Sequence, residues 1–227
     1  MSESPLRTSA GPIAVVAGGL LVVAQVGMIL AADPAGVGAS LTHPLFQVFN
    51  AGYAVAFPLL MLALVGLYWR QAREAGRFGA IAFCVATAGT VLLGGDMYFE
   101  GFAAPWLIRV APDLLSTDRG ALLVAAWLVS VVLFSLGWAL FGMVSWGTRM
   151  LPRGVSAALV VGGLLGFQAA VPPWGAALGL AVAAAGMWLL RQDRSVPHVQ
   201  ALGEPPTVSG RRYPNRGETG STRATRA

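Results

Sequence analysis

FQVFNAGYAVAFPLLMLALVGLYW, residues 46–69, is an uncharged and strongly apolar segment. The arginine-containing segment RQAREAGR (70–77) follows it, and a second apolar segment, FGAIAFCVATAGTVLLGGDM (78–97), comes next. A helix needs about 20 apolar residues to cross the hydrocarbon core of a bilayer. Both apolar segments are long enough, and arginines between them are typical of a loop that stays in the cytoplasm. The three segments together predict two membrane-spanning helices joined by a cytoplasmic loop.

The composition of the whole chain is that of a membrane protein. Hydrophobic residues make up 56% of its 227 residues and charged residues 11%, against roughly 25% charged in soluble domains. The net charge of +5 comes from arginine alone, because the chain has no lysine. This bias, with abundant Ala, Gly and Val, indicates a GC-rich coding sequence and favours a bacterial origin. Since the arginines flank apolar segments, we attribute them to membrane topology and expect no nucleic-acid partner.

Four further apolar segments complete the predicted fold, an all-α integral membrane protein with six transmembrane helices and short loops within residues 11–190. Pro172-Pro173 must separate the last two helices, because proline lacks the amide hydrogen and blocks the preceding helical turn. The first apolar segment exceeds the 7–15 residues usual for the core of a signal peptide, so we expect a retained helix. The six predicted helices cover residues 11–32, 46–69, 78–97, 120–146, 154–171 and 174–190.

The distribution of arginine predicts the orientation of the bundle. Arginines flank the second and fourth loops and follow the last helix, whereas the first loop and the Pro172-Pro173 turn have none. Short arginine-rich loops stay in the cytoplasm, so we expect both termini there, in a bacterial cytoplasmic (inner) membrane. Residues 1–10 form the predicted N-terminal tail. Residues 191–227 are rich in Arg, Pro and Gly and poor in large apolar residues, which predicts a disordered cytoplasmic tail.

The segment GGDMYFE (94–100) carries the most informative polar residues, Asp96 and Glu100. Residues four apart share one face of a helix, and acidic residues in a membrane segment are costly and often functional. Counted from Arg77, Asp96 lies about 28 Å along its helix, near the outer edge of the hydrocarbon. Two interpretations stay open: interfacial carboxylates that reach water or pair with Arg109 or Arg119, or a site for a proton, a cation or a substrate.

A short interfacial helix is predicted on the outer face, beginning near Pro105, because proline suits the first turn of a helix. This helix is placed to cover an outward-facing cavity, although simple anchoring at the membrane surface is the alternative. The candidate residues for binding a ligand or an ion are Asp33, His43, Asp96, Glu100 and Arg109.

Among the uncharged polar residues, Gln25 and Gln168 are the deepest amides in the predicted helices. Interhelical hydrogen bonds explain such residues, and a polar pathway is the alternative. Cys84 is the single cysteine, and neither of the two histidines falls within a predicted helix. We therefore predict no metal site, no haem or other cofactor, and no catalytic residues.

Three functions fit this sequence. The first is transport or sensing of a small solute or ion from the outer face, with Asp96 and Glu100 as the key residues. The second is a non-catalytic scaffold or accessory subunit, whose partners besides the lipid bilayer are another membrane protein or further copies of the chain. The third, an intramembrane enzyme using the carboxylates and His43, lacks a recognisable nucleophile or metal motif.

Overall fold

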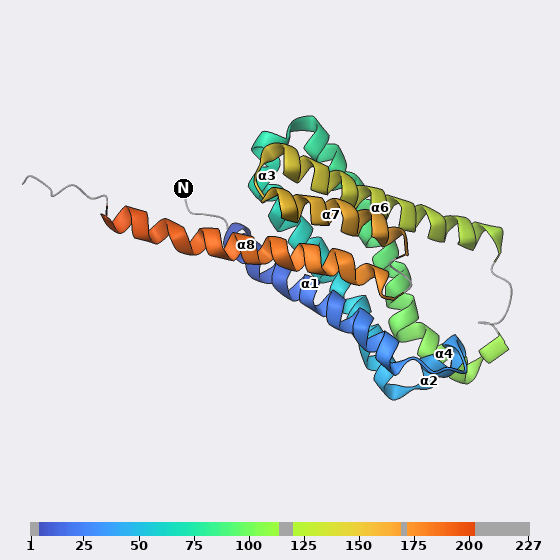
Figure 1. The fold of residues 1–227 in the computed structure, drawn as a ribbon. Coiled ribbons are helices and arrows are strands. Elements are labelled where there is room, and N and C mark those ends of the chain that lie inside the picture. Colours follow the sequence, from blue (N-terminus) through green and yellow to red (C-terminus); the bar gives the residue numbers. More distant parts are fainter. Residues whose placement is uncertain (1–4, 114–119, 169–171, 203–227) are drawn as a thin grey trace, which may run out of the picture. The chain divides into compact units, whose positions relative to one another are not determined.

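A computed structural model of the chain describes residues 5–113, 120–168 and 172–202, and in these ranges every regular element is helical (Figure 1). The prediction of an all-α fold is therefore confirmed for the described residues. The elements are α1 (Pro5–Ala31), α2 (Val37–Thr42), α3 (Pro44–Tyr98), the π-helical turn η1 (Phe99–Ala103), α4 (Ala104–Val110), α6 (Ala121–Thr148), α7 (Arg153–Leu165), the 3₁₀ turn η2 (Gly166–Gln168) and α8 (Trp174–Leu202).

Helix α3 is a hairpin of two antiparallel limbs, residues 44–75 and 77–98, folded at Gly76. The backbone of Gly76 is non-helical, with φ 57° and ψ −152°, a conformation that favours glycine because it has no Cβ. The rings of Tyr68 and Phe83 stack with centroids 4.2 Å apart, whereas residues this far apart in a straight helix are separated by about 22 Å. The two limbs contain the two apolar segments from which the fold was predicted.

The long apolar helices indicate a membrane-embedded protein. Four helical segments in the described residues are long and apolar enough to cross a membrane: Ser9–Ala31, Pro44–Val110, Ala121–Thr148 and Trp174–Arg194. The second of these contains the α3 hairpin, and the apolar helix Arg153–Leu165 is shorter. The number of membrane crossings therefore stays a prediction.

Successive helices approach one another closely at glycines and close into a ring. A Cβ on Gly18 of α1 would lie 2.6 Å from the backbone nitrogen of Ala183 in α8, and Figure 1 shows these two helices side by side. Five further glycines lie at the other contacts around the ring. They are Gly27 between α1 and the first limb of α3, Gly94 between the two limbs, Gly137 between the second limb and α6, Gly163 between α6 and α7, and Gly162 between α7 and α8. Small residues permit such close approach between membrane helices.

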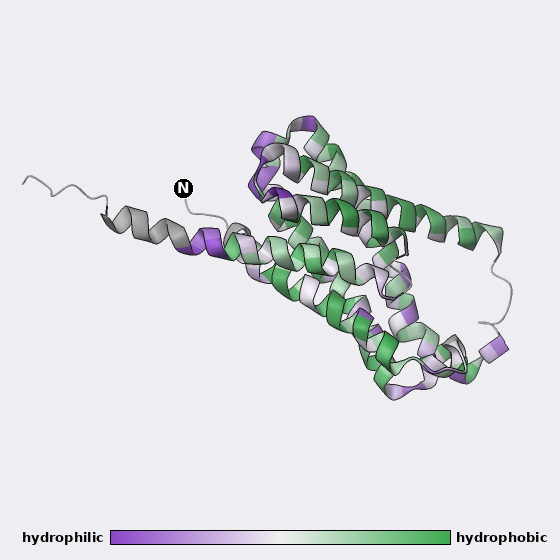
Figure 2. Ribbon diagram, in the orientation of Figure 1, coloured by the Kyte–Doolittle hydropathy of each residue, from purple (hydrophilic) through white to green (hydrophobic). Residues whose placement is uncertain are grey.

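One end of the bundle holds most of the arginines of the described residues. Arg70 of α3 forms a bidentate ion pair with Asp193 of α8, at 2.9 and 2.7 Å. The Gln71 Oε1 atom accepts hydrogen bonds from Ser145 and Thr148 of α6, at 3.1 and 3.3 Å. The bend of α3, the α6–α7 turn and α8 therefore share this arginine-rich end, which carries Arg70, Arg73, Arg77, Arg149, Arg153, Arg191 and Arg194. Figure 2 shows hydrophilic residues gathered at the α3 bend and the α6–α7 turn, and hydrophobic residues along the helices.

Several elements differ in length from the predicted helices. Helix α7 ends at Leu165, short of the predicted 154–171, because the chain tightens into η2 at Gly166; residues 169–171 lie outside the described residues. Helix α1 begins at Pro5, within the predicted N-terminal tail of 1–10. Helix α8 continues to Leu202, past the start of the predicted tail of 191–227, and the disorder of that tail stays a prediction. The ion pair of Asp193 with Arg70 holds the start of that extension, and residues 203–227 lie outside the described part.

Candidate functional site

Two buried residues, Gln25 and Tyr53, begin a polar cluster between α1 and the hairpin of α3. Gln25 is 0% exposed and Tyr53 is 2% exposed. The Tyr53 hydroxyl and the Gln25 side chain are hydrogen-bonded to each other. This bond satisfies polar groups that would be costly to bury alone, and it joins α1 to the first limb of α3.

The two predicted carboxylates lie near this pair. Tyr53 is within electrostatic range of both Asp96 and Glu100. From the first limb, the Asn50 Nδ2 atom donates a hydrogen bond to the backbone oxygen of Glu100 at 2.9 Å. The cluster therefore consists of Gln25, Asn50, Tyr53, Asp96 and Glu100, and we call it the carboxylate cluster.

A π-helical turn carries Glu100 into the cluster. Residues Phe99–Ala103 form η1, which continues directly from α3 into α4. Such π-helical turns are rare and occur often at functional sites, since the extra residue re-aims side chains. Both Asp96 and Glu100 are half-buried. Each of the two side chains is therefore partly enclosed by the bundle and partly open to its surface.

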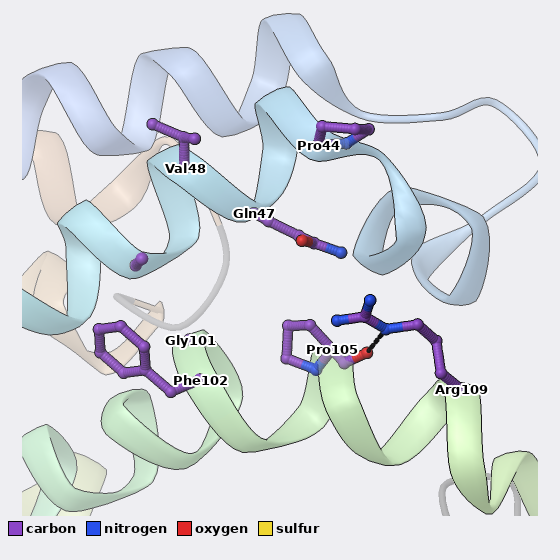
Figure 3. Close-up of a pocket in the computed structure, with 8 residues that line it drawn as sticks. Pro44, Gln47, Val48, Gly101, Phe102, Pro105 and Arg109 are labelled. Carbon is purple, nitrogen blue, oxygen red and sulfur yellow. Dashed lines mark hydrogen bonds between the residues drawn. The ribbon is translucent and has the colours of Figure 1, made fainter.

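An open groove lies beside the cluster, at the end of the bundle opposite the arginine-rich end (Figure 3). Its volume is about 440 Å³, within the roughly 300–1,000 Å³ of small-molecule sites. Two of its lining residues, Ala51 and Gly101, directly follow Asn50 and Glu100 of the cluster. The groove is lined by Pro44, Gln47, Val48, Ala51, Gly101, Phe102, Pro105 and Arg109.

Arg109 and Gln47 supply the polar side chains of the groove. The Arg109 Nε atom donates a hydrogen bond to the backbone oxygen of Pro105 at 3.1 Å, and Figure 3 shows the guanidinium facing Gln47 across the groove. The Gln47 Nε2 atom donates to the backbone oxygen of Leu41 at 2.7 Å. Both side chains are thus oriented by backbone contacts. Pro105 occupies the first turn of α4, as the sequence predicted.

The other two candidates, Asp33 and His43, lie in the connection from α1 to α3 and line no part of the groove. Asp33 shapes a local turn: its Oδ1 atom accepts from the backbone nitrogen of Ala35 at 2.8 Å, and its own nitrogen donates to the Ser40 Oγ atom at 2.8 Å. His43 joins α2 to α3 and its side chain is exposed. The structure therefore brings together three of the predicted residues, Gln25, Asp96 and Glu100.

Neither Tyr53 nor Asn50 was singled out from the sequence. The available signal was that these two polar residues stand among small residues in an apolar segment. This pattern alone carries little information about a site. Gln168, the other predicted amide, ends η2, and its side chain lies outside the described part of the structure.

A chain of aromatic rings extends from the cluster into the centre of the bundle. Successive centroids are 5.4 Å apart from Tyr53 to Phe57, 5.7 Å to Phe134, 6.5 Å to Trp138 and 6.1 Å to Phe141. These side chains are almost fully buried. They fill the space between the carboxylate cluster and the arginine-rich end.

No protein-family model matches the chain, and no curated protein or solved structure is significantly similar to it. The site is therefore interpreted from its chemistry. Two carboxylates, a phenol and two amides offer oxygen ligands of the kind that hard cations prefer. The same carboxylates also exchange protons.

Proposed function

We propose that the chain is a multi-pass protein of a bacterial inner membrane that binds a proton or a small cation at the carboxylate cluster, as a transporter or a sensor. The observation that carries this proposal is that Asp96 and Glu100 lie within electrostatic range of the buried Gln25–Tyr53 pair, with Asn50 hydrogen-bonded to the backbone of Glu100. A carboxylate held within a membrane bundle is costly. Binding a proton or a cation lowers that cost, so occupancy and conformation become linked.

The proposed topology has six crossings, with each limb of α3 crossing once and both termini in the cytoplasm. The arginine-rich end supports it, because positively charged ends of membrane helices stay in the cytoplasm. The carboxylate cluster, the groove and α4 then face outward, with α4 lying at the outer interface. A shorter α7 fits this arrangement if it packs between α6 and α8 rather than in contact with lipid along its full length.

The groove opens to the outer face beside the cluster in this proposal. Its floor residues Ala51 and Gly101 are direct chain neighbours of the cluster residues Asn50 and Glu100. On the other side, the aromatic chain from Tyr53 to Phe141 blocks passage toward the arginine-rich end. In this proposal the cluster is reached from the outer face, and a transporter must move these rings to release its ion inward. A sensor needs no such opening.

Ion flux into proteoliposomes separates these roles. Vesicles that contain the purified protein and an internal pH- or cation-sensitive dye are given an inward gradient of protons, Na⁺ or K⁺. A transporter moves one of these ions, and Asp96→Asn abolishes the flux while Glu74→Gln, an exposed carboxylate at the arginine-rich end, keeps it. Binding without flux identifies a sensor. If the protein shows neither ion binding nor ion flux, the proposal is overturned and the scaffold function is favoured. A stoichiometric partner that co-purifies in mild detergent is then the expected finding.

A further inference from the structure

Arg109 presents a positive charge to the groove, and among the described residues no carboxylate forms an ion pair with it. In the described residues, the ion pair of the chain is Arg70 with Asp193, and Arg109 hydrogen-bonds to Pro105 of its own helix. Its side chain is exposed, and its guanidinium faces the groove (Figure 3). A guanidinium has five N–H donors in a planar fork, and the one on Nε is hydrogen-bonded to Pro105.

The walls around this charge are apolar. Pro44, Val48, Phe102 and Pro105 line the groove, and both Val48 and Phe102 continue outward as exposed side chains, at 66% and 45%. Exposed Trp106 on α4 is adjacent, and indole rings prefer the depth of lipid headgroups. A ligand that fits must therefore be anionic at one end and apolar at the other, and it must reach the groove from the membrane surface.

We propose that the groove binds the headgroup of an anionic phospholipid. Its phosphate accepts hydrogen bonds from the Arg109 guanidinium, which recognises phosphate as a bidentate fork. The glycerol and the first acyl carbons then lie on Val48 and Phe102. This inference rests on the proposed membrane placement of α4 and not on ion binding at the carboxylate cluster.

The test compares lipids that share acyl chains and differ in charge. Protein in neutral detergent receives phosphatidylglycerol, phosphatidylcholine or soluble glycerol phosphate, and the thermal midpoint is measured against concentration. Phosphatidylglycerol should raise the midpoint at lower concentration than phosphatidylcholine, because a ligand of the folded form stabilises by mass action. Glycerol phosphate should have no effect. Arg109→Gln should weaken the apparent affinity for phosphatidylglycerol about tenfold.

Two variants serve as controls. Arg73→Gln removes one exposed arginine from the opposite end and should leave the response to phosphatidylglycerol unchanged. Val48→Trp fills the groove without touching Arg109 and should also weaken the response, which keeps the test decisive if Arg109→Gln does not fold. Equal responses to the two lipids, or an unchanged response in both groove variants, would overturn the proposal. A full response to glycerol phosphate would overturn the assignment to a lipid. Asp96→Asn should retain the response to phosphatidylglycerol. A failure of the ion-binding proposal is therefore distinguishable from a failure of the lipid proposal.

Discussion

Gly18 lies where α1 and α8 approach most closely, and replacing it with alanine should force the two helices apart. The added Cβ would lie 2.6 Å from the backbone nitrogen of Ala183 and 3.0 Å from the Ala183 Cβ, and it would also meet the backbone oxygen of Gly179. Backbone atoms cannot rotate away as a flexible side chain does. The contact must therefore be relieved by movement of a whole helix.

The structure sets the size of the effect. Ordinary van der Waals contact begins at 3.4 Å, so α1 must move about 0.8 Å away from Ala183, and overpacking of this kind costs about 1–3 kcal/mol. Gly19 is the matched control, because a Cβ there has nothing within 4 Å. Gly19→Ala should leave stability unchanged or raise it by up to about 1 kcal/mol, the difference in helix propensity. The two variants should thus differ by about 1–4 kcal/mol.

Unfolding in mixed micelles with increasing dodecyl sulfate, followed by circular dichroism, measures this difference. Gly18→Ala should unfold at a lower detergent fraction than the native chain, and Gly19→Ala at the same fraction or a higher one. Equal stabilities for the two variants would refute the close packing of α1 on α8. That result would also remove the basis for a closed ring of helices.

Three further predictions use the same unfolding measurement. Asp193→Asn breaks the ion pair with Arg70, in which the Arg70 side chain is 13% exposed and the Asp193 side chain 34%. The loss of stability should be about 1 kcal/mol after allowance for screening by solvent. An unchanged stability at low salt would show that the pair does not hold α8. Gly76→Ala should cost about 1–3 kcal/mol, because the backbone there has φ 57° and ψ −152°, and a stabilised variant would contradict the hairpin. Tyr53→Phe and Gln25→Leu should couple by about 0.6 kcal/mol in a double-mutant cycle, whereas strict additivity would rule out their hydrogen bond.

The sequence predicts the helical class and the arginine-rich end because both follow from local composition. A run of apolar residues and the arginines beside it carry the membrane signal without knowledge of the fold. Helix ends were less predictable. Residues 70–75 contain arginines and a glutamate, and they were placed in a loop, yet they remain helical because Gln71 is buried against Ser145 and Thr148 of α6. Such a contact depends on a helix that is distant in the chain.

The candidate site was predictable for the charged residues and not for the neutral ones. Asp96 and Glu100 stand out in an apolar sequence because charge is expensive there. Tyr53 and Asn50 are ordinary residues of an apolar segment, and their role appears only when the α3 hairpin brings residue 50 beside residue 100. Asp33 and His43 were included for their chemistry, but the short helix α2 keeps them in the connecting segment.

Thermal unfolding of the purified protein across pH and a panel of cations tests the central claim, ion binding at the carboxylate cluster, most directly. The native chain should show a midpoint that rises with one cation or with protons, since a ligand at a hundred times its Kd stabilises the folded form by about 2.7 kcal/mol. Asp96→Asn and Glu100→Gln should lose that rise, and Glu74→Gln should keep it. Flat curves for the native chain, or the same rise in all four proteins, would contradict the account and leave Asp96 and Glu100 as interfacial residues without a ligand.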